Sequence, residues 1–450
     1  MFDSCRRVTV LLLAFLVARS ATAAALLAAP AATLALVGGQ VIDGYEGPPI
    51  QNGVVLIAGD RILAVGPRSE IQVPEGVAVI STEGMSVLPG LMDMHVHLMI
   101  LGHSDYEHWD TTYMPRFRDE IMPAAAKQLL LSGVTTVRDL GAPLDDILEM
   151  RRRIAAHEIP GPRLFVSGPF IQRAPYSPYE KDIRWGVQGP ADAAAKVQKL
   201  LDAGVDFIKL IDQDQLTEDE VRAVVETAHR AGKPVVAHAH REDEIRVGLK
   251  FGVDCFEHTG LATEPGYPED ILAGLRKRNQ TLYWTPTIEG LFLAEYTANR
   301  FPERLDDPEW RRDLPVDLAN DIRASLDDLT HLDYFTLTFR RLPTLADKFR
   351  QLRSTGVTLM VGTDSGIPGN FHTDSTWREL VKFVEFGMTP MQAIGAATRW
   401  PARFLKMEHR LGTLEAGAFA DVIAVRGDVL ADIGLLREVD VVVRDGRRYK

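Results

Sequence analysis

The chain has 450 residues, of which 46% are hydrophobic and 25% are charged, and this composition is typical of a folded globular protein with a sizeable core. Its formal net charge of −12 argues against nucleic acid as a partner, because a phosphate-binding surface needs an excess of basic residues. The length exceeds one ordinary domain and suits a large barrel with a smaller satellite domain.

Residues 1–24 have the features of a secretory signal peptide. Two arginines precede an apolar run from Val8 to Ala18, and small residues follow. An uncleaved membrane anchor is the alternative, but the run is too short to span a bilayer. We therefore expect an exported protein, periplasmic or secreted, with no membrane contact after cleavage. Removal of Cys5 would leave Cys255 as a buried apolar residue without a disulfide partner.

Short β-strands separated by turns are expected at both ends of the chain. Residues 34–88 contain strand-like runs such as Val54–Ile57 and Ile62–Val65, and residues 404–450 show the same pattern of apolar runs separated by turns. Neither end has enough residues to bury a sheet alone. Because the termini of a domain are often close in space, the two ends are predicted to form one small composite β-sandwich.

Residues 89–403 alternate strand-like and helix-like segments, which predicts a parallel (β/α)₈ barrel of the TIM type. A doubly wound open sheet is the alternative. Over 60 residues separate the last two strands, and the helix-like stretches at 317–328 and 345–352 form either a lid or a packing pair. The predicted strands are Leu91–His97, Thr135–Asp139, Leu164–Val166, Phe207–Ile211, Val235–Ala239, Cys255–His258, Leu282–Thr285 and Leu359–Gly362.

Polar side chains occur where the predicted strands end, which is the edge where barrel enzymes carry their reactive groups. Imidazole and carboxylate are preferred ligands of borderline metals such as zinc, so these residue types suit a metal site. Because side chains alternate along a strand, the two histidines of a His-x-His pair share one face. The candidates are His95, His97, Lys209, His238, His240, His258 and Asp364.

Each candidate has an ordinary structural explanation when it is considered alone. A His-x-His pair occurs by chance, and Thr363–Gly366 has the composition of a turn or a helix cap. Lys209 lies in the apolar run Phe207–Ile211, where an unpaired ammonium is costly. A carboxylate such as Asp206 or Asp212 could neutralise it. The joint order of the candidates, at the expected ends of successive strands, favours a shared function.

These motifs resemble those of the amidohydrolase superfamily over about residues 34–450. The spacing from Lys209 through His258 is similar to that of the branch with imidazolonepropionases, metal-dependent prolidase-like dipeptidases and ochratoxin-type amidases. The residues that carry the resemblance are Pro89–His97, Lys209, His238, His258, Asp364 and the linking segment Leu411–Asp421.

The resemblance implies a dinuclear metal centre. Two divalent ions, expected to be zinc, would activate a bridging water, with Asp364 as general acid and base. Lys209, carboxylated on its amine, would bridge the two ions, which explains a lysine in an apolar strand. The first ion would be held by His95, His97 and Asp364, and the second by His238 and His258.

The same resemblance implies hydrolysis of an amide bond in a small molecule, with a dipeptide or an N-acyl amino acid as the expected substrate. His240 would face the pocket and meet a substrate carboxylate. A cyclic amide, a lactone or a phosphoester is the alternative substrate, and a non-catalytic metal-binding protein is a more distant hypothesis. The chain could form a homo-oligomer. Further substrate-binding candidates are Arg138, Arg173, Tyr176 and His372.

Overall fold

The computed structural model describes residues 31–173, 181–260, 264–291, 302–327, 329 and 333–450. The predicted signal peptide and Tyr176 lie outside these ranges. Residues Ala32–Lys450 form one compact unit. In the described part of the chain, each helix is too short or too polar to cross a lipid bilayer.

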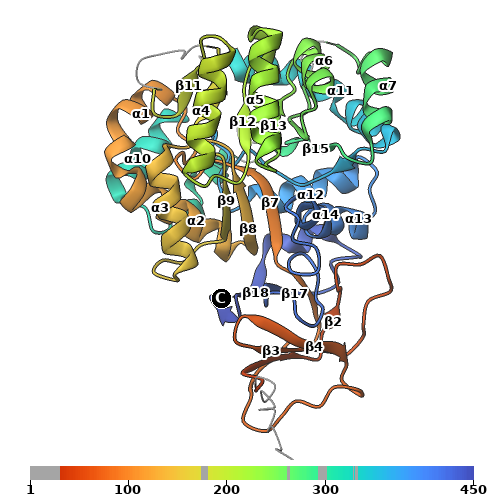
Figure 1. Ribbon diagram of the computed structural model, residues 1–450. Helices are drawn as coiled ribbons and strands as arrows, with labels where there is room; N and C mark the ends of the chain where they lie inside the picture. The colour runs from red at the N-terminus through yellow and green to blue at the C-terminus, as the bar shows by residue number, and fades with distance from the viewer. Residues whose placement is uncertain (1–30, 174–180, 261–263, 292–301, 328, 330–332) are drawn as a thin grey trace, which may run out of the picture. The chain divides into compact units, whose positions relative to one another are not determined.

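Two sheets are built from the ends of the compact unit (Figure 1). One sheet has the order β4 (Arg61–Pro67), β3 (Gly53–Ala58), β1 (Leu34–Val37) and β5 (Ala78–Ser81). The other has the order β19 (Arg447–Arg448), β18 (Val439–Arg444), β17 (Val422–Arg426), β6 (Met85–Pro89) and β2 (Gln40–Val41).

The second of these sheets joins segments that are far apart in the sequence. β17 runs antiparallel to β6, with Ile423 opposite Leu88, and β2 runs parallel to β6 on its other side. Apolar side chains of the two sheets form a common buried cluster, in which Val55 of β3 accompanies Val87 of β6 and Val443 of β18. This cluster draws on both ends of the chain, while Ala35, Val37, Val54 and Leu56 form a second buried cluster within the N-terminal sheet.

Parallel strands make up the central part of the molecule. Each strand predicted between residues 91 and 362 has a counterpart: β7 (Leu91–Val96), β8 (Val134–Asp139), β9 (Arg163–Val166), β12 (Ile208–Leu210), β13 (Val235–His238), β14 (Cys255–Glu257), β15 (Tyr283–Thr285) and β16 (Thr358–Leu359). They form a sheet β7–β8–β9 and a longer one that runs from β12 to β16 in chain order. The longer sheet also includes β10 (Phe170–Gln172) and β11 (Arg184–Gly186), which the sequence did not predict.

Hydrogen bonds outside the strand ladders connect the two parallel sheets at both ends. Asp206, just before β12, donates its N–H to Val166 of β9 at 2.9 Å. On the other side, Met94 of β7 donates to Val361 at 2.9 Å, and Val96 and Ser365 form a parallel bridge. The parallel strands are thus linked in sequence order from β7 to β16 and back to β7.

Amphipathic helices follow the strands, and α4, α5 and α6 lie along the outside of β12 and β13 (Figure 1). α5 shows why a helix begins where it does: Thr217 and Glu220 form a capping box that satisfies two backbone N–H groups. The α-helices of the described residues are α1 (Tyr106–Tyr113), α2 (Met122–Leu131), α3 (Leu144–Ala155), α4 (Pro190–Asp202), α5 (Glu218–Arg230), α6 (Glu242–Phe251), α7 (Glu269–Arg278), α9 (Pro308–Arg311), α10 (Val316–Ser325), α11 (Asp333–Thr355), α12 (Ser375–Glu385), α13 (Pro390–Ala396) and α14 (Arg399–Phe404).

Candidate metal centre

His95, His97 and Asp364 form the first group of possible metal ligands. The Nε2 atoms of His95 and His97 lie 3.4 and 3.1 Å from Oδ1 of Asp364. The segment before Asp364 packs closely against the strand that carries His95. A Cβ atom on Gly362 would lie only 2.9 Å from the backbone N of His95, so a larger residue would push the two segments apart. The strand end therefore needs glycine at this position.

A buried carboxylate fixes the turn that carries Asp364. Asp93 accepts hydrogen bonds from the N–H groups of His95 and Thr363, both at 3.1 Å, and its second oxygen accepts from the hydroxyl of Thr363 at 2.8 Å. Asp364 itself has φ = 58°, a left-handed conformation that is uncommon for a residue other than glycine. Such strained residues cluster at functional sites. The sequence analysis did not single out Asp93.

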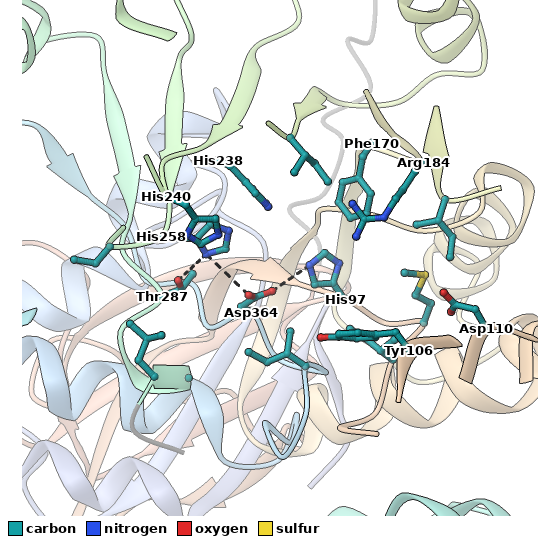
Figure 2. Close-up of a pocket in the computed structure, with 18 of the residues that line it drawn as sticks. His97, Tyr106, Asp110, Phe170, Arg184, His238, His240, His258, Thr287 and Asp364 are labelled. Atoms are coloured by element: carbon teal, nitrogen blue, oxygen red, sulfur yellow. Dashed lines mark hydrogen bonds and ion pairs between the residues drawn. The ribbon is translucent and has the colours of Figure 1, made fainter. Parts of the chain in front are cut away.

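His238, His240 and His258 form the second group of possible ligands. The ring of His240 is stacked on that of His258, with centroids 4.4 Å apart, and the ring of His238 lies 4.6 Å from that of His258. His258 Nδ1 lies 2.9 Å from the Thr287 hydroxyl and 4.0 Å from Oδ2 of Asp364. Figure 2 shows Asp364 between His97 and His258, so the two groups face one cavity.

Lys209 on β12 is fully buried, and its Nζ has no hydrogen-bond partner among the described residues. The two carboxylates considered as partners point elsewhere, since Asp206 pairs with Arg151 and Asp212 pairs with Arg241. A simple buried ion pair therefore does not explain this lysine. Its electrostatic neighbours include Asp364 and Glu257.

Burial sets the protonation state of the nitrogen ligands. It lowers the pKa of His95, His238 and His258 well below the usual range, so their imidazoles are neutral at pH 7, which is the form that binds metal. Burial also lowers the pKa of Lys209 to about 8. For Asp364, burial acts to raise the pKa, but the electrostatic interaction with His95 and the hydrogen bond with His97 lower it overall.

Glu257 connects His95 to Arg138 beneath the cavity. Its Oε2 lies 3.0 Å from Nδ1 of His95, and its Oε1 accepts a hydrogen bond from Nη2 of Arg138 at 2.5 Å. If Nδ1 carries the proton toward the carboxylate, Nε2 keeps its lone pair for a metal. Glu257 was not among the residues predicted from the sequence, although it directly precedes His258.

The expectation that Arg138 lies at the mouth of the pocket is corrected. Arg138 is fully buried and does not line the cavity that contains the histidines. Its guanidinium lies 5.0 Å from the ring centre of Phe404, and its Nε donates to the carbonyl of Met94 at 2.5 Å. It holds Glu257 in place and is out of reach of a substrate.

Three other candidates for substrate binding lie apart from this cavity or outside the described ranges. His372 is buried, with Nδ1 2.7 Å from the Ser365 hydroxyl and Nε2 3.1 Å from the Ile100 carbonyl. Arg173 is exposed and lines a different cavity, beside Glu220. Tyr176 is outside the described residues. His240 is the candidate that does line the cavity.

The cavity has a volume of about 240 Å³ and contains charged side chains that the sequence analysis did not select. Arg184 comes from β11 and Arg341 from α11, so both are contributed by segments outside the predicted strands. Tyr106 and Asp110 of α1 form another part of the wall (Figure 2). Two guanidinium groups near neutral imidazoles make the cavity suited to an anionic ligand.

The donor set fits divalent metal ions. Three buried nitrogens that face this region, His95 Nε2, His258 Nε2 and Lys209 Nζ, have no hydrogen-bond partner among the described residues. Unpaired buried polar atoms are costly in a folded protein, and a bound ion is one way to satisfy them. Imidazole and carboxylate ligands suit borderline metals such as zinc. Fold and site thus define a parallel α/β protein with a metal-ligand cluster at its strand ends.

The chain belongs to the amidohydrolase family, whose family model matches residues 86–449. It is a hydrolase that acts on carbon–nitrogen bonds. Ochratoxinase from Aspergillus niger is 26% identical over 460 aligned positions, which cover 92% of this chain and 85% of the relative.

Solved structures of the family share this fold. A Xaa-Pro dipeptidase with bound methionine is 26% identical, with a TM-score of 0.72 over 93% of this chain and 99% of that one. A prolidase in complex with N-methylphosphonate-L-proline is 22% identical, with a TM-score of 0.70 over 93% of this chain and 99% of that one. These likenesses agree with a mixed α/β fold of the TIM-barrel type.

Proposed function

We propose that the protein is a dinuclear metal-dependent amidohydrolase that cleaves the amide bond of a dipeptide or an N-acyl amino acid. The observation that carries this proposal is the convergence of two ligand groups at one cavity, with the buried Lys209 in the electrostatic surroundings of Asp364. His95, His97 and Asp364 would hold one ion, and His238 and His258 the other. Zinc is the proposed metal, because it favours this ligand set.

Bound divalent ions would supply an acidified water molecule and polarisation of the scissile carbonyl. The protein's own contribution begins with Asp364, whose Oδ1 is 3.1 Å from His97 Nε2 and whose side chain remains 19% exposed toward the cavity. This carboxylate would take the proton of the attacking water and return it to the leaving nitrogen, as a positioned general acid and base.

Lys209 is proposed to be carboxylated on its amine. The neutral amine nitrogen would attack carbon dioxide, forming an N–C bond and releasing a proton, and the resulting carbamate would offer two anionic oxygens to bridge the ions. The lowered pKa, about 8, supports this step, because a substantial fraction of the amine is unprotonated near neutral pH. The absence of a hydrogen-bond partner among the described residues supports it as well.

A substrate with a carboxylate is favoured by the charges of the cavity. Arg184 and Arg341 line it, and guanidinium groups bind carboxylates through charge-assisted hydrogen bonds. Asp110 lines the same cavity and would disfavour a second anionic group nearby. The dipeptidase and prolidase similarities support a dipeptide, and the ochratoxinase similarity supports an N-acyl amino acid.

The fold proposed to carry this site is a closed (β/α)₈ barrel of residues 89–403, together with a β-sandwich formed by residues 34–88 and 404–450. The bonds that return from Val361 and Ser365 to β7 support closure, and the pairing of β17 with β6 supports a composite sandwich. Residues 1–24 are proposed to direct export to the periplasm or the medium, on the strength of their apolar run.

The test is a substrate panel with purified enzyme reconstituted with zinc and bicarbonate. Dipeptides and N-acyl amino acids with a free carboxylate should be hydrolysed, and their carboxamide counterparts should be poorer substrates. Turnover of lactones, cyclic amides or phosphotriesters alone would contradict the proposed substrate class while leaving the metal centre in place. No turnover of any class by a metal-loaded preparation would favour a binding role.

A further inference from the structure

A second cluster of metal-ligand side chains lies outside the catalytic cavity. His103, His108 and Asp321 each offer one ligand atom within 4.8 Å of the others. His108 is on α1, His103 precedes that helix, and Asp321 is on α10 in the long connection between β15 and β16. The cluster lines a surface cavity of its own, which also includes Ser104 and Ser325.

The three side chains converge on one carboxylate oxygen. Oδ2 of Asp321 lies 2.8 Å from His108 Nε2 and 3.4 Å from His103 Nε2, and it accepts the hydroxyl hydrogen of Tyr113 at 2.7 Å. The ligand atoms of a tetrahedral zinc site lie roughly 3.3–3.4 Å apart, given metal–ligand bonds of about 2.0–2.1 Å. The His103–Asp321 separation has this value, and the His108–Asp321 pair would need to lengthen slightly.

The buried nitrogen of His103 is the second observation that points to a ligand. His103 is only 4% exposed, and its Nε2 has no hydrogen-bond partner among the described residues. Its Nδ1 lies 3.0 Å from the N–H nitrogen of Asp105 and 3.1 Å from the carbonyl oxygen of the same residue. Nδ1 accepts the N–H of Asp105, and binding of an ion at Nε2 would select the other tautomer, in which Nδ1 donates to the Asp105 carbonyl.

A comparison within the molecule shows that such a cluster is not always open to a metal. Asp212, Asp214 and Glu244 are also close enough to share an ion. Arg241, however, lies 2.7–2.8 Å from all three carboxylates and already serves as their cationic partner. Among the described residues, no arginine or lysine is paired with Asp321. Its partners are two imidazoles and a phenol, which a metal ion can join.

We propose that His103, His108 and Asp321 form a peripheral binding site for a divalent cation of the zinc type, separate from the catalytic centre. Two imidazoles and one carboxylate are a known protein ligand set for zinc, with a fourth position left for water. The ion would tie α10 to α1, where Ser104 already donates its N–H to the Ser325 hydroxyl at 3.0 Å. Because Tyr106 and Asp110 of α1 line the catalytic cavity, the ion would also steady that wall.

Zinc stoichiometry of the full chain tests the proposal. Wild-type protein, His108→Ala and Asp321→Asn are dialysed against the same zinc buffer, and bound zinc is measured by elemental analysis. His409→Ala serves as the matched control, because His409 is an exposed histidine that also contacts a carboxylate. We expect both cluster variants to bind about one zinc ion fewer per chain than the wild type and the control. Equal stoichiometry in all four proteins would overturn the proposal.

A second readout does not depend on activity, and the comparison with His108→Ala separates it from zinc bound at the catalytic centre. Addition of zinc should slow amide hydrogen exchange in Val316–Ser325 and in Tyr106–Tyr113 of the wild type, because the ion links these helices. The same addition should leave exchange in His108→Ala unchanged. His108 is half-exposed, so its removal should not prevent folding, and circular dichroism checks this. Equal protection in both proteins would contradict the site.

Discussion

His95 Nδ1 and Glu257 Oε2 lie 3.0 Å apart, and both side chains are fully buried. This pair determines which nitrogen of His95 is available at the cavity. The same carboxylate binds Arg138, so the guanidinium balances the negative charge of Glu257 while Glu257 orients the imidazole of His95. Carboxylate–histidine pairs of this kind set ligand orientation in many metal sites, and they raise the basicity of the ligand.

Glu257→Gln should weaken metal binding by about 10- to 100-fold, because the amide no longer favours a proton on Nδ1 of His95. Competition with a chromogenic chelator measures the affinity. Arg138 would lose its buried counter-ion, so thermal unfolding must show that the variant is folded. Glu415→Gln, on a partly exposed carboxylate remote from the cavity, is the control. A folded Glu257→Gln protein with wild-type affinity would refute the assigned role.

Asp364→Asn should reduce kcat by about 10²- to 10⁴-fold, because the amide cannot accept the proton of the attacking water. Its effect on zinc content should be smaller than its effect on turnover, since an amide oxygen can still reach the ion. Steady-state kinetics and elemental analysis on one preparation separate the two effects. Turnover within a few-fold of wild type, at full zinc content, would remove Asp364 from the proton-transfer step.

Formation of the active centre should depend on pH through Lys209. Burial lowers the pKa of this amine to about 8, so the neutral, reactive fraction rises as the pH approaches and passes that value. Reactivation of metal-free enzyme by zinc, at one fixed concentration of dissolved carbon dioxide, should be about 16-fold faster near pH 8 than near pH 6.5, because the neutral fraction of the amine rises from about 3% to about 50%. The activity of samples withdrawn over time and assayed at one pH gives the rate. A rate independent of both pH and bicarbonate would contradict carboxylation.

Arg184 and Arg341 provide a test of substrate recognition with an internal control. Replacement of the guanidinium that binds the substrate carboxylate should raise KM by about 10- to 100-fold, since a hydrogen bond to a charged group contributes about 1.5–3 kcal/mol. Arg184→Met and Arg341→Met are compared with Arg173→Met, which alters a different cavity. With the carboxamide form of the substrate, which lacks the charge, the KM values of these variants should be similar. A larger effect at Arg173 than at both cavity arginines would reverse the assignment.

The sequence predicted the parallel strands well, because they follow from local patterns, and the candidate ligands remain a prediction that rests on the same patterns. Apolar runs mark the parallel strands, and polar residues at their ends must lie at one edge of the molecule. His95 and His97 are brought together with Asp364 in this way, although Asp364 is far from both in the chain. Lys209 was recognisable because an ammonium is unusual in an apolar strand.

Contacts that depend on three-dimensional pairing were beyond the sequence. Arg138 stands near the end of β8, which suggested the pocket mouth, yet its side chain enters the interior to meet Glu257 on β14. No periodic pattern reports a partner that is over 100 positions away. Arg184 and Arg341 come from segments whose course over the strand ends is set by tertiary packing, so the charged wall of the cavity could not be foreseen.

The number of metal ions held by the catalytic centre is the most direct test of the proposed mechanism. It is best measured in the His108→Ala background, which removes the proposed peripheral site. Elemental analysis of active enzyme should give about two zinc ions per chain, and the further change Lys209→Ala should reduce zinc content and abolish most activity. Full activity in protein that contains neither metal nor a modified Lys209 would contradict the central claim.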